Sequence, residues 1–124
     1  MSKTILIIED DIFLQGLEAT KLKKEGFDIL SASNGREAYN IFDSKVKIDL
    51  LLLDLMLPEI DGFSILEKIK KDQSLASIPV IVFSNLSEEQ DIKRAEKLGI
   101  KEFIVKSNFN LDELAKKVKE IVSL

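Results

Sequence analysis

Short apolar runs alternate with amphipathic stretches along this chain, and the alternation repeats five times. The runs are rich in leucine and β-branched residues, a composition typical of strands that are buried on both faces of a parallel sheet. Between the runs, apolar residues recur every three or four positions, as they do along one face of a helix. Strands are predicted at residues 4–8, 28–33, 50–55, 78–83 and 102–105, each followed by a helix. This (βα)5 pattern predicts one α/β domain over residues 1–124, with a parallel sheet, right-handed crossovers and helices on both faces.

Residues with short polar side chains mark the starts of the predicted helices, because their oxygens accept the free N–H groups of a first helical turn. Asn34, Asp61 and Ser87 are the predicted caps of the second, third and fourth helices. The last helix is predicted to open at Asn110 or Ser107.

The first helix is predicted from about Asp11 to Glu25, and Gly26 suits the left-handed residue that ends it. Apolar residues at helical spacing define the side that is expected to pack on the sheet. These residues are Phe13, Leu14, Leu17 and Leu22.

The composition narrows the class of protein. Apolar residues make up 45% of the 124 residues and charged residues 32%, which is typical of a globular domain and not of a disordered chain. The net charge of −4 argues against nucleic acid as a direct partner. No apolar run approaches the roughly 20 residues of a membrane span, and the N-terminus lacks the apolar segment of a signal peptide. The expected compartment is therefore the cytoplasm.

The chain contains neither cysteine nor histidine. It therefore has no disulfide, no thiolate or imidazole ligand for zinc, and no cysteine nucleophile or histidine base. A metal would have to be held by oxygen atoms, which favours magnesium, calcium or manganese. The absence of a Gly-x-x-x-x-Gly-Lys phosphate loop and of a Gly-x-Gly-x-x-Gly motif argues against a nucleotide-binding enzyme.

Polar residues stand at the ends of four predicted strands. Glu9 and Asp10 follow the first strand, Asp54 stands at the end of the leucine-rich third, Ser84 follows the fourth and Lys106 the fifth. Because parallel strands share one direction, these side chains gather at one edge of the sheet, where open α/β sheets bind ligands. Each residue alone could be an ordinary polar strand end or turn residue. Their coincidence on four strands of one sheet indicates a site.

Three carboxylates at one edge repel each other. At about 4 Å and an effective dielectric constant near 20, each pair costs roughly 4 kcal/mol. A raised pKa or a bound cation relieves this repulsion. Magnesium suits one or two carboxylates together with water and substrate phosphate, while Lys106 offers a point charge and Ser84 a hydroxyl donor for a phosphoryl group.

In this order and spacing the motifs resemble the receiver domain of two-component response regulators, and the resemblance covers essentially the full chain. Its marks are Ile5–Ile8 before Glu9-Asp10, Asp54-x-x-x-Pro58 with Asp61-Gly62, then Ser84, then Phe103-x-x-Lys106. The resemblance implies a flavodoxin-like fold with strand order 2-1-3-4-5. It also implies that the protein is not an enzyme, beyond promoting phosphorylation and dephosphorylation of its own aspartate.

The resemblance implies that Asp54 accepts a phosphoryl group from a sensor histidine kinase or a histidine phosphotransfer protein. Ser84 and Lys106 would then grip the transferred phosphoryl, and Phe103 stands at the position of the family's switch aromatic. The resemblance further implies a Mg²⁺ site, with the protein ligands Glu9, Asp10, Asp54 and the backbone carbonyl of Met56.

The switch is expected to act on the face formed by the helix after Ser87, the 102–105 strand and the last helix, which would bind a downstream protein. A phosphorylation-dependent dimer is one form that this output could take. Because the chain ends with its fifth helix, we expect a single-domain regulator or a receiver excised from a larger one, without direct contact to nucleic acid or membrane. The exposed residues expected on this face have mixed charge: Lys93, Lys97, Lys101 and Lys116 among Glu89, Glu96 and Glu113.

Three residues depart from the family's pattern. Ser107 follows Lys106 where proline is usual, which leaves the local backbone, and so the aim of Lys106, undetermined. Asn85 stands where a small residue is usual, and it would either hinder the phosphodonor or offer the phosphoryl another donor. Phe103 lacks the hydroxyl of the commoner tyrosine, so a switch there would work by packing alone.

Three other functions stay open at this point. A binding module that keeps the fold without phosphorylation is supported only by Asn85 and Ser107. A phosphatase with an aspartate nucleophile would need a second aspartate two residues after Asp54, where Met56 stands. A flavin protein of the flavodoxin type would need a phosphate-cradling loop after the first strand, where Glu9-Asp10-Asp11 would repel phosphate unless a cation intervened.

Overall fold

Five parallel strands form a single sheet in the computed structural model, which describes residues 2–122. The strand order is β2-β1-β3-β4-β5, so the predicted flavodoxin-like α/β fold and its order 2-1-3-4-5 are confirmed. The leucine run of the sequence is the central strand β3, with all its residues buried. The strands are β1 (Thr4–Ile8), β2 (Asp28–Ala32), β3 (Leu50–Leu53), β4 (Val80–Ser84) and β5 (Glu102–Val105).

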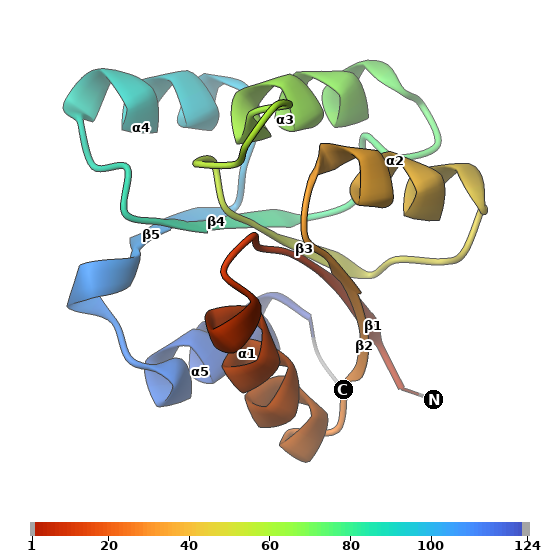
Figure 1. Cartoon of the computed structure of the whole chain (residues 1–124), viewed down its shortest axis with the longest axis vertical. Coiled ribbons are helices and arrows are strands. Elements are labelled where there is room, and N and C mark those ends of the chain that lie inside the picture. Colours follow the sequence, from red (N-terminus) through yellow and green to blue (C-terminus); the bar gives the residue numbers. More distant parts are fainter. Residues whose placement is uncertain (1, 123–124) are drawn as a thin grey trace.

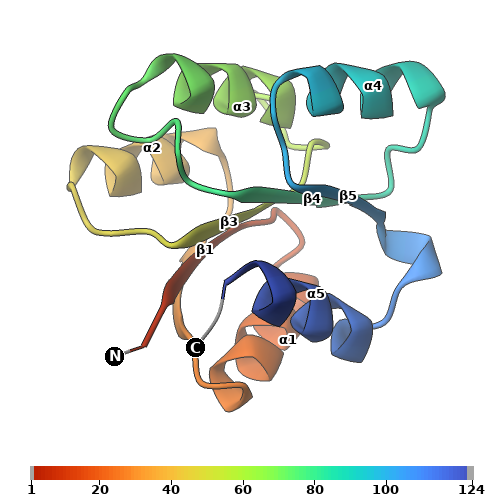
Figure 2. The ribbon, with the colours of Figure 1, turned by 180° about the vertical axis from the view of Figure 1, so that it is seen from behind.

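Helices cover both faces of the sheet. Figure 1 shows α2, α3 and α4 above the sheet and α1 and α5 below it, and the view from behind in Figure 2 agrees. A short 3-10 helix, η1, lies between β5 and α5. The helices are α1 (Ile12–Lys24), α2 (Gly35–Asp43), α3 (Gly62–Lys71), α4 (Glu89–Lys97), η1 (Lys106–Asn108) and α5 (Leu111–Ile121).

The core consists of two apolar layers, one on each face of the sheet. Successive residues of a strand point to opposite faces. In β1, Leu6 and Ile8 therefore join the layer under α2, α3 and α4, whereas Ile5 and Ile7 join the layer against α1 and α5. Burial on both faces explains why the strands are continuous apolar runs.

Most of the predicted helix starts are confirmed. Asn34 accepts a hydrogen bond from the Glu37 N–H at 2.9 Å, and Asp61 caps α3 in the same way. Of the two candidates for the last helix, Asn110 is the cap of α5.

The predicted cap at Ser87 is wrong. Helix α4 begins at Glu89, and its N-cap residue Glu88 makes no side-chain capping hydrogen bond. The residues just before this helix make a different contact. The Ser84 hydroxyl accepts a hydrogen bond from the Leu86 N–H at 3.2 Å. That bond lies at the start of the loop of residues 85–88, which separates β4 from α4.

The predicted inner side of α1 is wrong in part. Leu22 is buried, but Phe13 is 77% exposed and Leu17 is 42% exposed. The helix instead turns the stripe of Leu14, Glu18 and Leu22 toward the sheet, and Glu18 and Leu22 are its buried residues. A carboxyl group therefore lies where the apolar pattern predicts hydrocarbon.

Among residues 2–122, none of the helices combines the length and the apolar character that a membrane crossing requires.

Candidate functional site

The candidate site lies at the edge of the sheet where β1, β3, β4 and β5 end. Ile8 pairs with Leu53 across β1 and β3, so the next residues, Glu9 and Asp54, come side by side. The Asp54 N–H donates to the carbonyl of Ile8 at 3.1 Å and fixes this register. The parallel register therefore brings together acidic residues that lie 45 positions apart in the sequence.

Three carboxylates converge at this edge. Glu9 and Asp54 are 2% and 5% exposed, whereas Asp10 is open to solvent. Each of the three offers an oxygen that lies within 4.8 Å of those of the others. The cluster predicted from the strand ends is therefore present, with two buried carboxylates and one at the surface.

Lys106 bridges the two buried carboxylates. Its Nζ lies 2.7 Å from Oδ2 of Asp54 and 2.6 Å from Oε1 of Glu9. Burial alone would lower the pKa of the Lys106 ammonium, but its hydrogen bonds to Asp54 and Glu9 outweigh burial and raise the pKa. The sequence placed Lys106 at this edge, but it did not predict that the lysine itself neutralises the carboxylates.

Burial acts in the opposite direction on Glu9. It raises the pKa of the Glu9 carboxyl, and the hydrogen bonds from Lys106 and from the Asp11 N–H offset this rise only in part. Removal from water penalises the charged form more than these partners favour it. Glu9 is therefore poised to gain from any additional positive charge placed beside it.

The loop after Asp54 holds the carboxylate from its other side. The Met56 N–H donates to Oδ1 of Asp54 at 3.0 Å. The chain then returns so closely that a Cβ on Gly62 would stand 2.4 Å from the Cα of Leu55 and 2.6 Å from the backbone oxygen of Asp54. Only glycine allows this approach, which explains the Asp61-Gly62 pair at the start of α3.

The donor set fits a hard divalent cation. Oxygen atoms are the ligands that magnesium prefers, and one or two carboxylates with water form its usual protein site. Glu9, Asp10 and Asp54 supply such oxygens within a small space. The buried Glu9, whose ionised form is disfavoured, gives the cluster a further reason to accept a cation.

Ser84 is the last residue of β4, and Phe103 lies on the neighbouring strand β5. Ser84 is fully buried, and its hydroxyl accepts the N–H of Leu86. Phe103 is half-buried, pairs with Val82 and packs against the apolar layer under α2, α3 and α4. The two predicted switch residues thus occupy adjacent strands on the side of the sheet that α4 covers.

Comparison with known proteins identifies the family. The sequence matches the model of the response regulator receiver domain over residues 5–119. This chain belongs to that family. Transcriptional regulatory protein CrdR of Helicobacter pylori is 36% identical over 119 residues, a match that covers 96% of this chain and 54% of CrdR. The chain spans about half the length of the curated relatives it matches.

Solved structures agree with the receiver fold. A two-component response regulator from Clostridium difficile is 30% identical, with a TM-score of 0.89 and coverage of 98% of this chain and 96% of that one. The phosphorylated cyanobacterial phytochrome response regulator RcpA is 32% identical, with a TM-score of 0.84 and coverage of 98% and 91%. The fold and the family are therefore established together.

Two departures of this receiver domain from the expected motif meet in space. Oδ1 of Asn85 accepts the backbone N–H of Ser107 at 3.1 Å. Ser107 belongs to η1, which begins at Lys106. The sequence marked both positions as unusual, but no local signal indicated that they contact each other.

Gln15 and Glu18 are residues of α1 that the sequence reading missed. The Gln15 amide nitrogen donates to the carbonyl of Glu9 at 2.9 Å and to that of Ala32 at 3.2 Å, so it ties α1 to the ends of β1 and β2. Glu18 is buried, and its Oε1 has no hydrogen-bond partner. The sequence signal that could have indicated them is the presence of polar residues within an otherwise apolar face of this helix.

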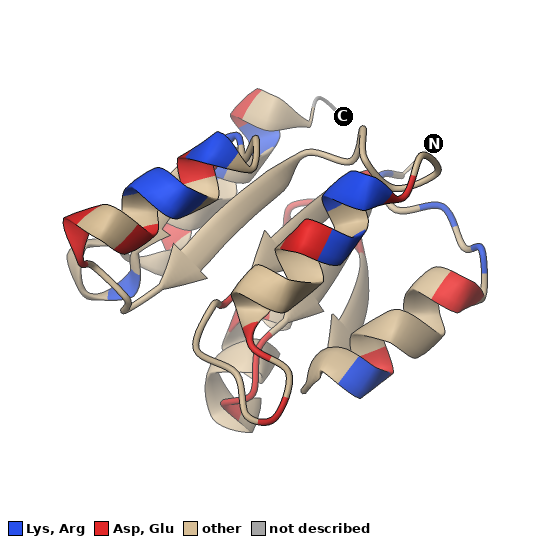
Figure 3. Ribbon diagram, turned by 90° about the horizontal axis from the view of Figure 1, so that it is seen from above, with Lys and Arg blue, Asp and Glu red and all other residues tan. Residues whose placement is uncertain are grey.

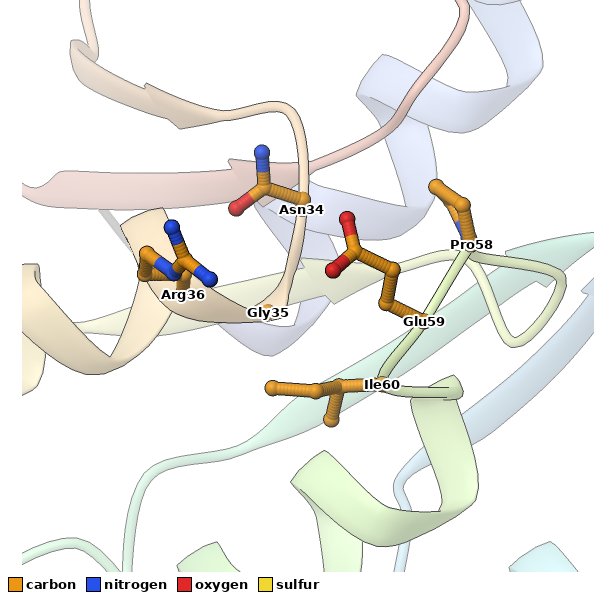
Figure 4. Close-up of a pocket in the computed structure, with 6 residues that line it drawn as sticks. All are labelled: Asn34, Gly35, Arg36, Pro58, Glu59 and Ile60. Carbon is orange, nitrogen blue, oxygen red and sulfur yellow. The ribbon is translucent and has the colours of Figure 1, made fainter.

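A small cavity lies between the start of α2 and the loop before α3 (Figure 4). Its volume is about 80 Å³, and Arg36 and Glu59 line it from opposite sides. Glu59 has a φ of 62°, in the left-handed region, while a Cβ on Gly35 would stand 2.8 Å from that of Ile60. The two loops therefore pack closely, and the cavity contains none of the predicted site residues.

Proposed function

We propose that this receiver domain accepts a phosphoryl group on Asp54 in a two-component signalling system of the cytoplasm. The observation that carries the proposal is the position of Asp54, nearly buried at the sheet edge, with the Lys106 ammonium at 2.7 Å and two further carboxylates alongside. The phosphorylated state of the relative RcpA supports it. Because residues 1–124 contain no histidine, the phosphohistidine donor must lie outside them, in a sensor histidine kinase or a histidine phosphotransfer protein.

The transfer needs positioning and charge neutralisation more than covalent work by the protein. An Asp54 oxygen forms the new bond to phosphorus as the bond from phosphorus to the donor's imidazole nitrogen breaks, and the imidazole leaves. Lys106 neutralises a phosphoryl oxygen, and Ser84 donates its hydroxyl. Glu9, Asp10, Asp54 and the Met56 carbonyl would hold Mg²⁺, which when bound supplies further neutralisation of the phosphoryl oxygens.

The output is proposed to run through α4, β5 and α5. We expect Ser84 to turn away from the Leu86 N–H when it donates to the phosphoryl, which would free the loop that leads into α4. Phe103 can then rotate into the space that Ser84 leaves, so a local charge selects between two packed states. Figure 3, seen from above, shows basic and acidic residues mixed along α4, a surface suited to a protein partner or to a second phosphorylated copy.

Mass spectrometry after incubation with acetyl phosphate and magnesium tests the proposal. We expect the gain of one phosphoryl mass, lost in Asp54→Asn and in the presence of EDTA. Asp43→Asn, which changes an exposed aspartate at the end of α2, is the matched control and should be phosphorylated like the wild type. Phosphorylation that persists in Asp54→Asn would overturn the site assignment.

NMR with beryllofluoride, a phosphoryl mimic, tests the output face. We expect the backbone signals of residues 84–106 to shift when the mimic binds. Shifts confined to α1 and α2 would contradict the proposed switch. If the changes at 84–106 survive in Phe103→Leu, only the role of the aromatic ring is rejected.

A further inference from the structure

The two side chains proposed to bind the phosphoryl stand where β4 and β5 end: Ser84 is the last residue of β4, and Lys106 is the first residue after β5. Ser84 ends β4 and pairs with Val105 of β5, so Asn85 and Lys106 are the first residues beyond the paired strands. Beyond these residues, the hydrogen bonds between β4 and β5 no longer hold the two segments together. The hydrogen bond from the Ser107 N–H to Oδ1 of Asn85, at 3.1 Å, joins them again.

We propose that Asn85 is a positioning residue for phosphoryl transfer, which couples the Ser84 loop to the turn that carries Lys106. This inference rests on the proposed phosphorylation of Asp54. It makes Ser107 functionally necessary for its N–H, which a proline at this position would lack. The two unusual residues thus act together, because the Asn85 side chain of one loop binds the Ser107 backbone of the other.

The contacts on each side of this bond show what it would transmit. In the resting protein the Lys106 side chain is fixed by Asp54 and Glu9, while its backbone opens η1 and is followed directly by the bonded Ser107 N–H. On the other loop, the Ser84 hydroxyl is bonded to Leu86, so Asn85 lies between the two ends of that contact. A shift of the loop when Ser84 turns toward a phosphoryl would carry Asn85, and the bond to Ser107 would pass that shift to the turn that carries Lys106.

The bond between Asn85 and Ser107 is expected to affect how Lys106 is oriented for phosphoryl transfer. Both Asn85 and Ser107 are exposed, so their bond adds little burial and its effect should appear in reactivity more than in stability. A neutral hydrogen bond of this kind corresponds to about a threefold to tenfold change in a rate that depends on it. Asn85→Ala should therefore slow phosphorylation of Asp54 by acetyl phosphate by about that factor while the melting temperature stays nearly constant.

Three matched variants separate the hydrogen bond from other effects. Ser107→Ala keeps the N–H and loses only the hydroxyl, and Asn108→Ala removes the neighbouring amide side chain of the same turn. In both variants, Asp54 should be phosphorylated at the wild-type rate. Asn85→Asp keeps the acceptor oxygen, so in the resting protein it should restore the protection of the Ser107 amide from hydrogen exchange that Asn85→Ala loses.

The decisive experiment combines amide exchange at Ser107 with the rate of phosphorylation in wild type, Asn85→Ala, Asn85→Asp, Ser107→Ala and Asn108→Ala. An unprotected Ser107 amide in the wild type, or an unchanged rate in Asn85→Ala, would overturn the inference. A rate loss as large in Ser107→Ala as in Asn85→Ala would also overturn it. If the wild type gains no phosphoryl mass on Asp54, the proposed function itself fails, and the exchange data still report whether the two loops are joined.

Discussion

Glu18 should make this receiver domain less stable as the pH rises. Its carboxyl group is buried on the sheet side of α1, and Oε1 has no hydrogen-bond partner. Burial, followed by the negative charge of Glu9, raises the pKa of Glu18 from 4.5 to about 8, with further raising contributions from Asp54 and Asp11 and an opposing one from Lys106. Glu18 is therefore protonated in the folded protein at neutral pH, whereas in the unfolded chain it is ionised.

The sign and the size follow from proton linkage. Because the folded pKa lies above the unfolded one, the contribution of Glu18 to stability is fully present below pH 4.5 and is lost as the pH rises through about 8. One pKa unit corresponds to about 1.4 kcal/mol, so the loss reaches about 3 kcal/mol by pH 7 and about 5 kcal/mol above pH 8. Domains of this kind have a total stability of only about 5–15 kcal/mol, so the effect is measurable.

Urea unfolding at pH 5 and pH 8 tests this linkage in wild type, Glu18→Gln and Glu18→Leu. Between these pH values the wild type should lose about 3 kcal/mol more free energy of unfolding than Glu18→Gln. Glu18→Leu, which completes the stripe of Leu14 and Leu22, should be the most stable of the three at pH 8. Glu96→Gln, which changes an exposed glutamate of α4, should keep the wild-type dependence. Equal pH dependences in wild type and Glu18→Gln would refute the reasoning.

Three further substitutions test the site. Lys106→Met leaves two buried carboxylates without their cation, so the free energy of urea unfolding at pH 7 should fall by about 3 kcal/mol. Added magnesium should recover part of this loss. An unchanged urea midpoint would contradict the bridging role of Lys106 between Glu9 and Asp54. Asp10→Asn should raise the melting temperature without magnesium and lose most of the magnesium-dependent shift, and a full shift would exclude Asp10 as a ligand. Gly62→Ala should cost at least about 2 kcal/mol, because its Cβ would meet the Cα of Leu55 at 2.4 Å; a neutral effect in the same assay would show that the loop can move.

The sheet was predictable because its strands are apolar on both faces. A continuous run such as Leu50–Leu53 has no polar face to confuse with a helix, and its end fixes where Asp54 must stand. The start of α4 was not predictable in the same way. Ser87 has the right side chain for a cap, but the preceding residues are held by a local bond to Ser84 and by a bond to the distant Ser107, and only the folded chain creates the second contact.

The orientation of α1 and the role of Lys106 show a second limit. Helix α1 has apolar residues on more than one side, so spacing alone could not decide that Phe13 faces solvent and Glu18 faces the core. For Lys106, strand order predicts the neighbourhood but not the partner. Which carboxylate an ammonium contacts depends on side-chain geometry at a few ångströms, and such detail leaves no trace in a pattern of apolar and polar positions.

Charge balance at the sheet edge links the resting structure to the proposed switch. Three carboxylates and one ammonium leave two negative charges in excess, which matches the charge of a divalent cation. A phosphoryl on Asp54 would replace one negative charge by about 1.5 to 2 and place it farther from the backbone. Within residues 2–122, Lys106 is the one cationic side chain in salt-bridge contact with this cluster, so under the proposed switch it would leave Glu9 to follow the phosphoryl. We propose that this movement would pull on the turn bonded to Asn85, so that the charge that attracts Lys106 would also displace the loop that leads into α4.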